Sequence, residues 1–396
     1  MATVAILGFT SGLPLNLTGA TMQAWLQWAG VDLRYIGLLS LVGLPYTVKF
    51  LWSPLFDRFP IDGLGRRRGW IAITALALMV LLVLLPRTDP AGHLRLAALA
   101  AFGIAFASAS ADIVIDGYRT ELLPPDQLGP GVALHQNLYK VGMLVAGSLA
   151  LVLSDHLSWR AVYAIMALGL LPGAVAALYA PEPVDHGRPR TLREACVEPF
   201  RDLLGRRKAW ELLAFILLYK LGDNLCVALS TIFFLGKGFS RTEIGLVGKT
   251  LGMACLIGGG FLGGWLMSRW SLKRSLWVFG VLQLIAMTGH LALSISGKSH
   301  VLLMVAIAVE NTIFAMGSVA YVALIQRCCS LKNAATQFAL LSSLAALGRV
   351  LFASPVGFLV RWFGWPVFFL FCMGMAVPGL LLLRRFDGWE LAEPAP

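Results

Sequence analysis

The feature that most constrains this chain is a series of apolar runs, each long enough to cross a lipid bilayer. A spanning helix needs about 20 mostly apolar residues. Because lipid offers no hydrogen bonds to the backbone, we expect every run to be an α-helix. The sequence contains twelve such runs: 3–28, 35–56, 69–86, 94–118, 130–154, 159–180, 209–236, 243–267, 274–296, 300–326, 334–360 and 365–384.

The composition agrees with an all-α membrane protein. Of the 396 residues 58% are hydrophobic and 13% charged, and the mean hydropathy is +0.76. A soluble domain carries about 25% charged residues. The net charge of +11 does not indicate nucleic-acid binding, because the basic residues lie in short loops between the apolar runs. The six cysteines and six histidines show no metal-ligand spacing, so we expect no metal and no cofactor.

The runs fall into two halves of six. Residues 181–208 between them are charged and rich in Pro and Arg, so we expect domains at 1–180 and 209–396 joined by a cytoplasmic linker at 181–208. The halves repeat, because "GVDLRYIGLLSLVG" (30–43) aligns with "GFSRTEIGLVGKTLG" (238–252). A parallel duplication of a six-helix half is the architecture of the major facilitator superfamily. The sequence therefore predicts twelve transmembrane helices in two six-helix bundles.

The loop charges predict the orientation in the membrane. Loops on the side of the central linker hold 19 Lys and Arg, those on the opposite side hold 8, and five lie inside the runs. Basic loops stay in the cytoplasm. We therefore expect both termini and the linker to be cytoplasmic. The first run lacks a basic region before it and a cleavage site after it, so we expect a retained first helix rather than a signal peptide.

Two aspartates stand out in the fourth run. At 100° per residue, Asp112, Asp116 and Arg119 fall on one narrow stripe of a helix. A charge near the bilayer centre costs about 2.5–3.5 kcal/mol, so it needs a partner, water or a function. Close, desolvated carboxylates raise each other's pKa, which lets one hold a proton near neutral pH. We expect Asp112 to carry a proton and Asp116 to modulate it; the alternative for Asp116 is a structural pair with Arg119.

Other polar side chains inside the runs are candidates for substrate binding. Three amides form a stripe on the first helix, where the alternative function is to hold helices together. Lys140 is a candidate partner for Asp112 or for a substrate carboxylate. Lys220 and Asp223 have the spacing of a structural pair, and Arg349 has a helix carboxylate as its alternative partner. The predicted substrate-binding residues are Asn16, Gln23, Gln27, Asn137, Lys140, Lys220, Asp223, Asn224, Tyr321 and Arg349.

Some classes of function are disfavoured by motifs that the sequence lacks. There is no G-x-x-x-x-G-K-[ST] loop, so ATP-driven transport by this chain alone is not expected. No set of nucleophile and base or of metal ligands indicates an enzyme. The loop after the second run has the pattern D-R…G-R-R-R, which resembles the cytoplasmic gating motif of the superfamily. Asp57 with Arg66, Arg67 and Arg68 is therefore predicted to hold one state by pairing across the halves.

Several blocks of the sequence resemble a particular family. The blocks are "LGFTSGLPLNLTGATMQAWL", "VKFLWSPLFDRF", "GRRRGW", "ASADIVIDGYRTELLP", "LLYKLGD", "VGKTLG" and "ATQFALLSSLAALGRV". They are similar to blocks of the AmpG-type muropeptide permeases, and the similarity runs from the first helix to the twelfth. The resemblance implies that Asp112 and Asp116 are the functional acids, and that Lys220 and Asp223 matter for transport.

The resemblance also implies a function. Members of that family import anhydromuropeptides released from the cell wall across the bacterial inner membrane with protons, and their uptake feeds wall recycling and β-lactamase induction. We therefore expect a monomeric symporter that takes an anionic sugar–peptide as its substrate. Two alternatives stay open: a siderophore-uptake permease of a neighbouring branch, which shares the compact twelve-helix design, and a transporter-like sensor without flux.

Overall fold

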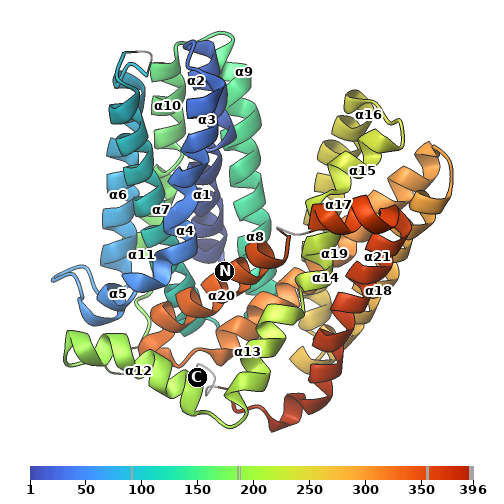
Figure 1. The fold of residues 1–396 in the computed structure, drawn as a ribbon. Helices are drawn as coiled ribbons and strands as arrows, with labels where there is room; N and C mark the ends of the chain where they lie inside the picture. Colours follow the sequence, from blue (N-terminus) through green and yellow to red (C-terminus); the bar gives the residue numbers. More distant parts are fainter. Residues whose placement is uncertain (91, 185–186, 188, 354–355, 392–396) are drawn as a thin grey trace.

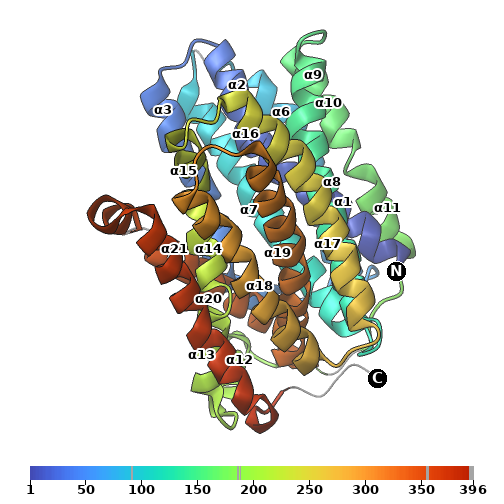
Figure 2. The same ribbon diagram turned by 90° about the vertical axis from the view of Figure 1, so that its right-hand side faces the viewer.

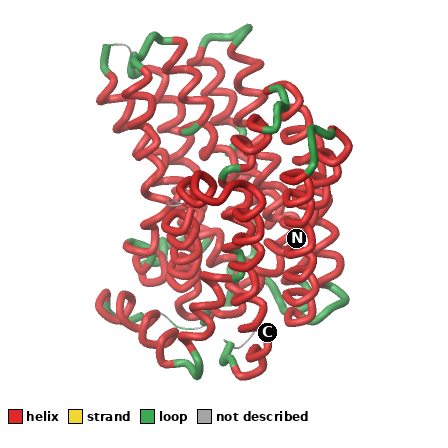
Figure 3. Tube along the Cα trace, turned by 45° about the vertical axis from the view of Figure 1, so that its right-hand side comes forward, coloured by secondary structure: helices red, strands yellow, loops and turns green. Residues whose placement is uncertain are grey.

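The computed structural model describes residues 1–90, 92–184, 187, 189–353 and 356–391. Over these residues the chain folds into helices joined by short loops, with one isolated bridge between Ile61 and Gly65 and no strand (Figure 3). The prediction of an all-α protein is confirmed for this part of the chain.

The first six predicted runs fold into eleven α-helices and four short segments of tighter or wider helix. They are α1 (Ala2–Thr18), α2 (Ala20–Trp28), α3 (Leu33–Leu38), η1 (Leu39–Gly43), α4 (Leu44–Val48), η2 (Lys49–Leu51), α5 (Pro54–Arg58), α6 (Arg68–Leu84), η3 (Leu85–Arg87), α7 (Leu94–Leu122), α8 (Leu128–Leu144), η4 (Val145–Leu149), α9 (Ala150–Ser154), α10 (Trp159–Leu168) and α11 (Leu171–Tyr179).

The linker and the second half follow the same plan. Their elements are α12 (Leu192–Gly205), α13 (Ala209–Leu218), α14 (Leu221–Ala228), α15 (Ser230–Gly236), α16 (Arg241–Gly245), η5 (Leu246–Leu251), α17 (Gly252–Met267), α18 (Leu272–Ile295), α19 (His300–Cys328), η6 (Leu331–Asn333), α20 (Ala334–Ala353), α21 (Val356–Leu382) and η7 (Leu383–Gly388). The repeat predicted from the sequence is visible in α7 and α19, which both have 29 residues.

Nine helical stretches in the described part of the chain are long and apolar enough to cross a membrane. Three predicted runs are not among them. The first breaks between α1 and α2 at Gly19, and the second breaks into the short pieces α3 to α5. The eleventh run extends past α20 over residues 354–355, which lie outside the described residues.

The breaks have local causes. Pro14 lies inside α1, and Gly19 has φ −101° and ψ −114°, which is not helical. In the second run Pro45 and Pro54 each begin a new helix, where a missing backbone N–H costs nothing. Discontinuous helices of this kind leave backbone groups open beside a cavity in transporters.

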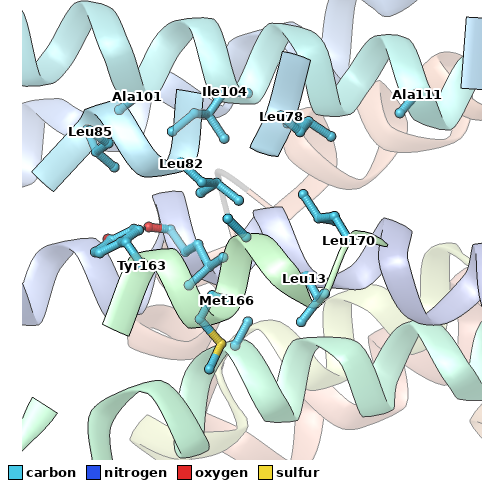
Figure 4. Packing of buried hydrophobic residues seen from close by; sticks show 14 of the residues in the cluster. Leu13, Leu78, Leu82, Leu85, Ala101, Ile104, Ala111, Tyr163, Met166 and Leu170 are labelled. Carbon is cyan, nitrogen blue, oxygen red and sulfur yellow. The ribbon is translucent and has the colours of Figure 1, made fainter. Parts of the chain in front are cut away.

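Buried apolar side chains form a large cluster in the first half. Figure 4 shows Leu82, Leu85 and Ile104 beside Tyr163 and Met166, which come from α6, η3, α7 and α10. The cluster also contains Ala335 and Ala339 of α20, although the rest of it lies before the linker. A helix of the second half therefore packs directly into the core of the first half.

The helices form two groups, which meet at the end that carries α12 and diverge toward the other end (Figure 1). We call the end with α12 the linker side. Figure 2 shows α17 and α19 side by side along the second group, and α17 contacts α8 of the first group. The division into domains at 180 and 209 stays a prediction.

The run "GGGFLGG" (258–264) on α17 explains this close contact. A Cβ added at Gly260 would lie 2.3 Å from Oδ1 of Asn137, and one at Gly264 would lie 2.5 Å from Cβ of Ala133, both on α8. Added Cβ atoms at Gly259 and Gly263 would instead meet the backbone of α19. The glycines thus let α17 approach two helices at once, so the run serves helix packing.

Candidate functional site

The two aspartates of α7 have different partners. Oδ1 of Asp116 accepts a hydrogen bond of 2.8 Å from Arg119, and its Oδ2 lies 3.5 Å from Nζ of Lys49. Asp112 accepts a short hydrogen bond from the hydroxyl of Ser11 on α1. Within the described part of the chain, Asp112 forms no ion pair.

This difference separates the possible roles of the two acids. Asp116 is held by two cations in a site where its side chain is 13% exposed, so its negative charge is compensated. Asp112 has only a neutral hydrogen-bond donor, so gaining a proton breaks no ion pair. The structural pair between Asp116 and Arg119 that the sequence suggested is present, and it does not exclude a modulating role.

A cavity of about 340 Å³ lies between the two groups of helices. Gln136 lines it from α8, and Lys220, Asn224 and Tyr321 line it from the second half; its other lining residues are Ile216, Leu217, Phe314, Ser318, Val322, Ser342, Ala345 and Ala346. The cavity combines an apolar wall with a few polar groups, which is typical of a small-molecule site.

Lys220 is the charged group of this cavity. Its Nζ lies 2.7 Å from Oδ2 of Asp223 and 3.9 Å from the ring centre of Phe314. The predicted pair of Lys220 and Asp223 is therefore present. Its ammonium also lies near enough to Lys140 of α8 for the two charges to repel each other. Two cations that face one another across a gap favour an anion between them.

Lys140 and Asn137 connect α8 to α17. Nζ of Lys140 is 3.4 Å from Oδ1 of Asn137 and 3.5 Å from the carbonyl of Leu256. Nδ2 of Asn137 donates to the carbonyl of Ile257 at 3.0 Å. The alternative partner for Lys140 that the sequence suggested, Asp112, does not pair with it here. Its contacts are long, so the ammonium keeps capacity for another acceptor.

The remaining predicted binding residues lie in varied surroundings. Nδ2 of Asn16 donates to the carbonyl of Met143 at 2.7 Å, which joins α1 to α8. Gln23 and Gln27 are exposed on α2. The hydroxyl of Tyr321 donates to the carbonyl of Ile216 at 2.5 Å. The side chain of Arg349 lies outside the described residues.

A buried network closes the linker side, which we call the linker-side gate and define by Asp57, Arg67, Glu121 and Thr336. Oδ2 of Asp57 accepts the backbone N–H and the hydroxyl of Thr336 in the first turn of α20, at 2.9 and 2.6 Å. Oδ1 of Asp57 pairs with Arg67 at 2.6 Å, and Arg67 pairs with Glu121 at 2.5 Å. A carboxylate at a helix N-terminus meets free N–H groups and the positive end of the helix dipole.

The three arginines of the predicted gating motif bind within the first half. Burial lowers the pKa of Arg67, but Glu121 and Asp57 outweigh it and raise the pKa, so the guanidinium stays charged. Arg66 pairs with Glu121 at 2.8 Å. Arg68 donates to the carbonyls of Ala177 and Leu178 on α11. The bonds from Asp57 to Thr336 cross between the halves.

Further contacts across the halves surround the gate. The guanidinium of Arg119 lies 5.7 Å from the ring centre of Phe338, and Nε2 of Gln326 is 3.4 Å from Oγ1 of Thr120. From the linker side, Nζ of Lys332 lies 2.9 Å from both carboxylate oxygens of Glu198 on α12. These contacts join α7 to α19 and α20, and α12 to η6.

Sequence reasoning missed several partners of the predicted residues. The sequence did not indicate four of them, because each is a common residue type whose role depends on a contact with a residue far away in the sequence. These are Ser11, Glu121, Thr336 and Phe338. Thr336 is 279 residues from Asp57.

Comparison with known proteins gives the family. The model of the Major Facilitator Superfamily matches residues 4–353. The anhydromuropeptide permease of Escherichia coli K12 is 46% identical over 96% of this chain and 78% of its own length. The putative transporter AmpG 1 of Rickettsia conorii is 32% identical over 96% of both chains.

Solved structures share the fold. The transporter FucP in its outward conformation has a TM-score of 0.74 at 16% identity, with 97% of both chains covered. The proton:xylose symporter XylE has a TM-score of 0.70 at 14% identity and covers 97% of this chain and 94% of its own. Together with the match to the family model, these findings confirm the predicted fold class. The chain therefore belongs to the Major Facilitator Superfamily and, within it, to the family of the anhydromuropeptide permeases, which are multi-pass membrane transporters and not enzymes.

Proposed function

We propose that this protein imports anhydromuropeptides together with protons across the inner membrane of a bacterium, as a monomer that works by alternating access. The observation that carries the proposal is the cavity between the halves, with Lys220 in its wall and Lys140 nearby, in a chain 46% identical to an anhydromuropeptide permease. A sugar–peptide with free carboxylates is the kind of ligand that such a cavity attracts.

Each part of the ligand has a matching group. Lys220 and Lys140 bind its carboxylates, because an anion between them removes their mutual repulsion. Gln136 and Asn224 in the cavity wall bind hydroxyl and amide groups of the sugar or the peptide. Asp223 keeps Lys220 charged and oriented in the absence of substrate. In another state of the transport cycle, the other predicted residues face the cavity and complete the site. They include Gln23, Gln27 and Arg349.

Proton coupling in this proposal rests on Asp112. Its only described side-chain partner is Ser11, whose hydroxyl can donate to the carboxylate or accept from the carboxylic acid. Asp116 pairs with Lys49 and Arg119, so these two cations are already bound and Asp112 keeps a neutral partner. Proton binding and release at Asp112 then change the contacts between α7 and α1.

The linker and both termini lie in the cytoplasm in this proposal, because 19 of the 32 Lys and Arg belong to the loops of that side. The linker-side gate then closes the cytoplasmic entrance. The state described here is accordingly the one that accepts substrate from the periplasm, and opening the bond between Asp57 and Thr336 is a step of release.

Uptake into proteoliposomes under an imposed pH gradient tests the proposal. Labelled anhydromuropeptide is expected to accumulate, and an uncoupler is expected to abolish accumulation. A ferric siderophore added in excess is expected not to compete. Uptake of the ferric siderophore instead would assign the substrate to the neighbouring branch. Saturable binding without accumulation would identify a sensor and reject transport.

A further inference from the structure

A second polar cluster lies inside the second half and has no role in the proposal above. Its members are Cys226 on α14, His290 on α18 and Glu310 on α19, and their ligand atoms all lie within 4.8 Å of one another. Cys226 and His290 are fully buried. We propose that this cluster is a binding site for a divalent transition-metal ion, with Zn²⁺ as the reference ion.

The distances fit a shared ion. Nε2 of His290 and Oε2 of Glu310 are 3.3 Å apart. Ligand atoms bound to one tetrahedral Zn²⁺ at about 2.0–2.3 Å are separated by roughly 3.3–3.7 Å. The spacing of the imidazole and the carboxylate is therefore that of two corners of a tetrahedron. The sulfur of Cys226 lies within 4.8 Å of both atoms, so it is the third candidate ligand.

The imidazole of His290 is the second observation that indicates a ligand. Neither of its ring nitrogens has a hydrogen-bond partner among the described residues, although the side chain is completely buried. It packs instead against the rings of Phe234 and Phe369, at 5.6 and 5.4 Å between ring centres. Leaving a buried polar group unsatisfied costs about 1–3 kcal/mol. A metal bond to the imidazole removes that cost.

The donor set selects the class of ion. A thiolate, an imidazole and a carboxylate suit borderline-soft ions such as Zn²⁺ and Co²⁺, whereas Mg²⁺ and Ca²⁺ prefer oxygen ligands alone. The side chain of Glu310 is 13% exposed, so the cluster is not completely sealed from its surroundings. Binding releases the proton of the Cys226 thiol, because the thiolate is the ligand.

The position of the site predicts its effect on transport. Cys226 lies three residues after Asp223 on the same helix, so the ion site is one turn from the ion pair that supports Lys220 in the cavity. A bound ion ties α14 to α18 and α19. Because α14 lines the cavity, fixing it hinders the rearrangement that alternating access requires.

The experiment uses the full-length protein in detergent with Co²⁺ as the probe. We expect one Co²⁺ per chain, an absorption band from charge transfer between the thiolate and the metal, and loss of the spectrum when Zn²⁺ is added. Cys226→Ser is expected to abolish the thiolate band and to weaken Co²⁺ binding at least tenfold. Cys255→Ser, on α17 and outside the cluster, is the matched control and should bind like the wild type.

A measurement on the unaltered protein covers the case in which Cys226→Ser does not fold. X-ray absorption of the Zn²⁺-loaded wild type is expected to show one sulfur ligand at about 2.3 Å together with nitrogen or oxygen ligands. Absence of a sulfur ligand, no stoichiometric Co²⁺ binding, or a thiolate band that survives in Cys226→Ser would each overturn the proposal. These readouts do not depend on which substrate the protein carries.

Discussion

At the scale of single residues, substitution of Asp112 is the most direct test of the proposed proton coupling. Asp112→Asn keeps the size of the side chain and its hydrogen bond with Ser11 but cannot be ionised. We expect it to abolish accumulation driven by a pH gradient while exchange of substrate between the two sides continues, because exchange needs no net proton movement. Paired uptake and counterflow assays measure this. Asp116→Asn is the comparison, and wild-type accumulation in Asp112→Asn would refute the role.

Asp57 provides a second prediction at this scale. Asp57→Ala removes both the acceptor for the N–H of Thr336 and one partner of the buried Arg67. The bonds to Thr336 cross between the halves, and a hydrogen bond to a charged group contributes about 1.5–3 kcal/mol, which corresponds to a shift of roughly 10- to 150-fold between states. We expect the closed linker side to become a minor state, seen as longer distances between spin labels on α5 and α20.

Thr336→Val is expected to have a smaller effect on the linker-side gate than Asp57→Ala. It removes the hydroxyl bond to Asp57 but keeps the backbone N–H bond, so it should shift the same distance distribution less than Asp57→Ala does. Equal and unshifted distributions in the two variants would show that the linker-side gate does not hold this state.

At the scale of elements, we predict that the contact of the linker helix α12 with Lys332 changes only at low pH and at high pH. A backbone N–H of Arg190 and then Lys332 lower the pKa of Glu194, while Glu198 and then Glu194 raise the pKa of Lys332 above its usual 10.5. The carboxylate of Glu194 contributes fully above its usual pKa of 4.5 and loses its effect as the pH falls through the lowered pKa. The ammonium of Lys332 contributes fully below its usual pKa of 10.5, and this contribution is lost as the pH rises through the raised pKa.

The contact between α12 and Lys332 should therefore stay constant between about pH 5 and pH 9 and weaken below about pH 4.5. Energy transfer between fluorophores on α12 and α20 measures the contact across a pH series. The side chains are about one-third exposed, so salt should weaken the contact as well. Lys332→Met is expected to remove both dependences, and release between pH 6 and pH 8 would contradict the assignment.

The elements also show what the sequence could predict and what it could not. The apolar runs predicted the helices from length alone, because a bilayer fixes how many apolar residues a span needs. The short pieces α3 to α5 were predicted as one span, since prolines at helix starts change the backbone without lowering hydropathy. The stripe of Asp112, Asp116 and Arg119 followed from helix geometry, whereas the partners Ser11 and Thr336 depend on packing between distant helices.

At the scale of the whole molecule, the contacts between the two halves include the linker-side gate, the packing of α20 against α7, and the contact of α17 with α8. The contact of α17 with α8 depends on glycines, because an added Cβ at Gly264 would lie 2.5 Å from Cβ of Ala133. Close glycine contacts between membrane helices are lost when larger side chains push the backbones apart. The same run on α17 also holds Gly258, where an added Cβ meets nothing within 4 Å.

Gly264→Leu is therefore expected to disfavour the state described here, and Gly258→Leu is its matched control with the same change of hydropathy and helix propensity. Overpacking costs about 1–3 kcal/mol, which corresponds to a shift of roughly 5- to 150-fold between states. Distances between spin labels on α8 and α17 should lengthen in Gly264→Leu and stay unchanged in Gly258→Leu. If both variants keep the wild-type distances, the contact of α8 with α17 does not set the resting state.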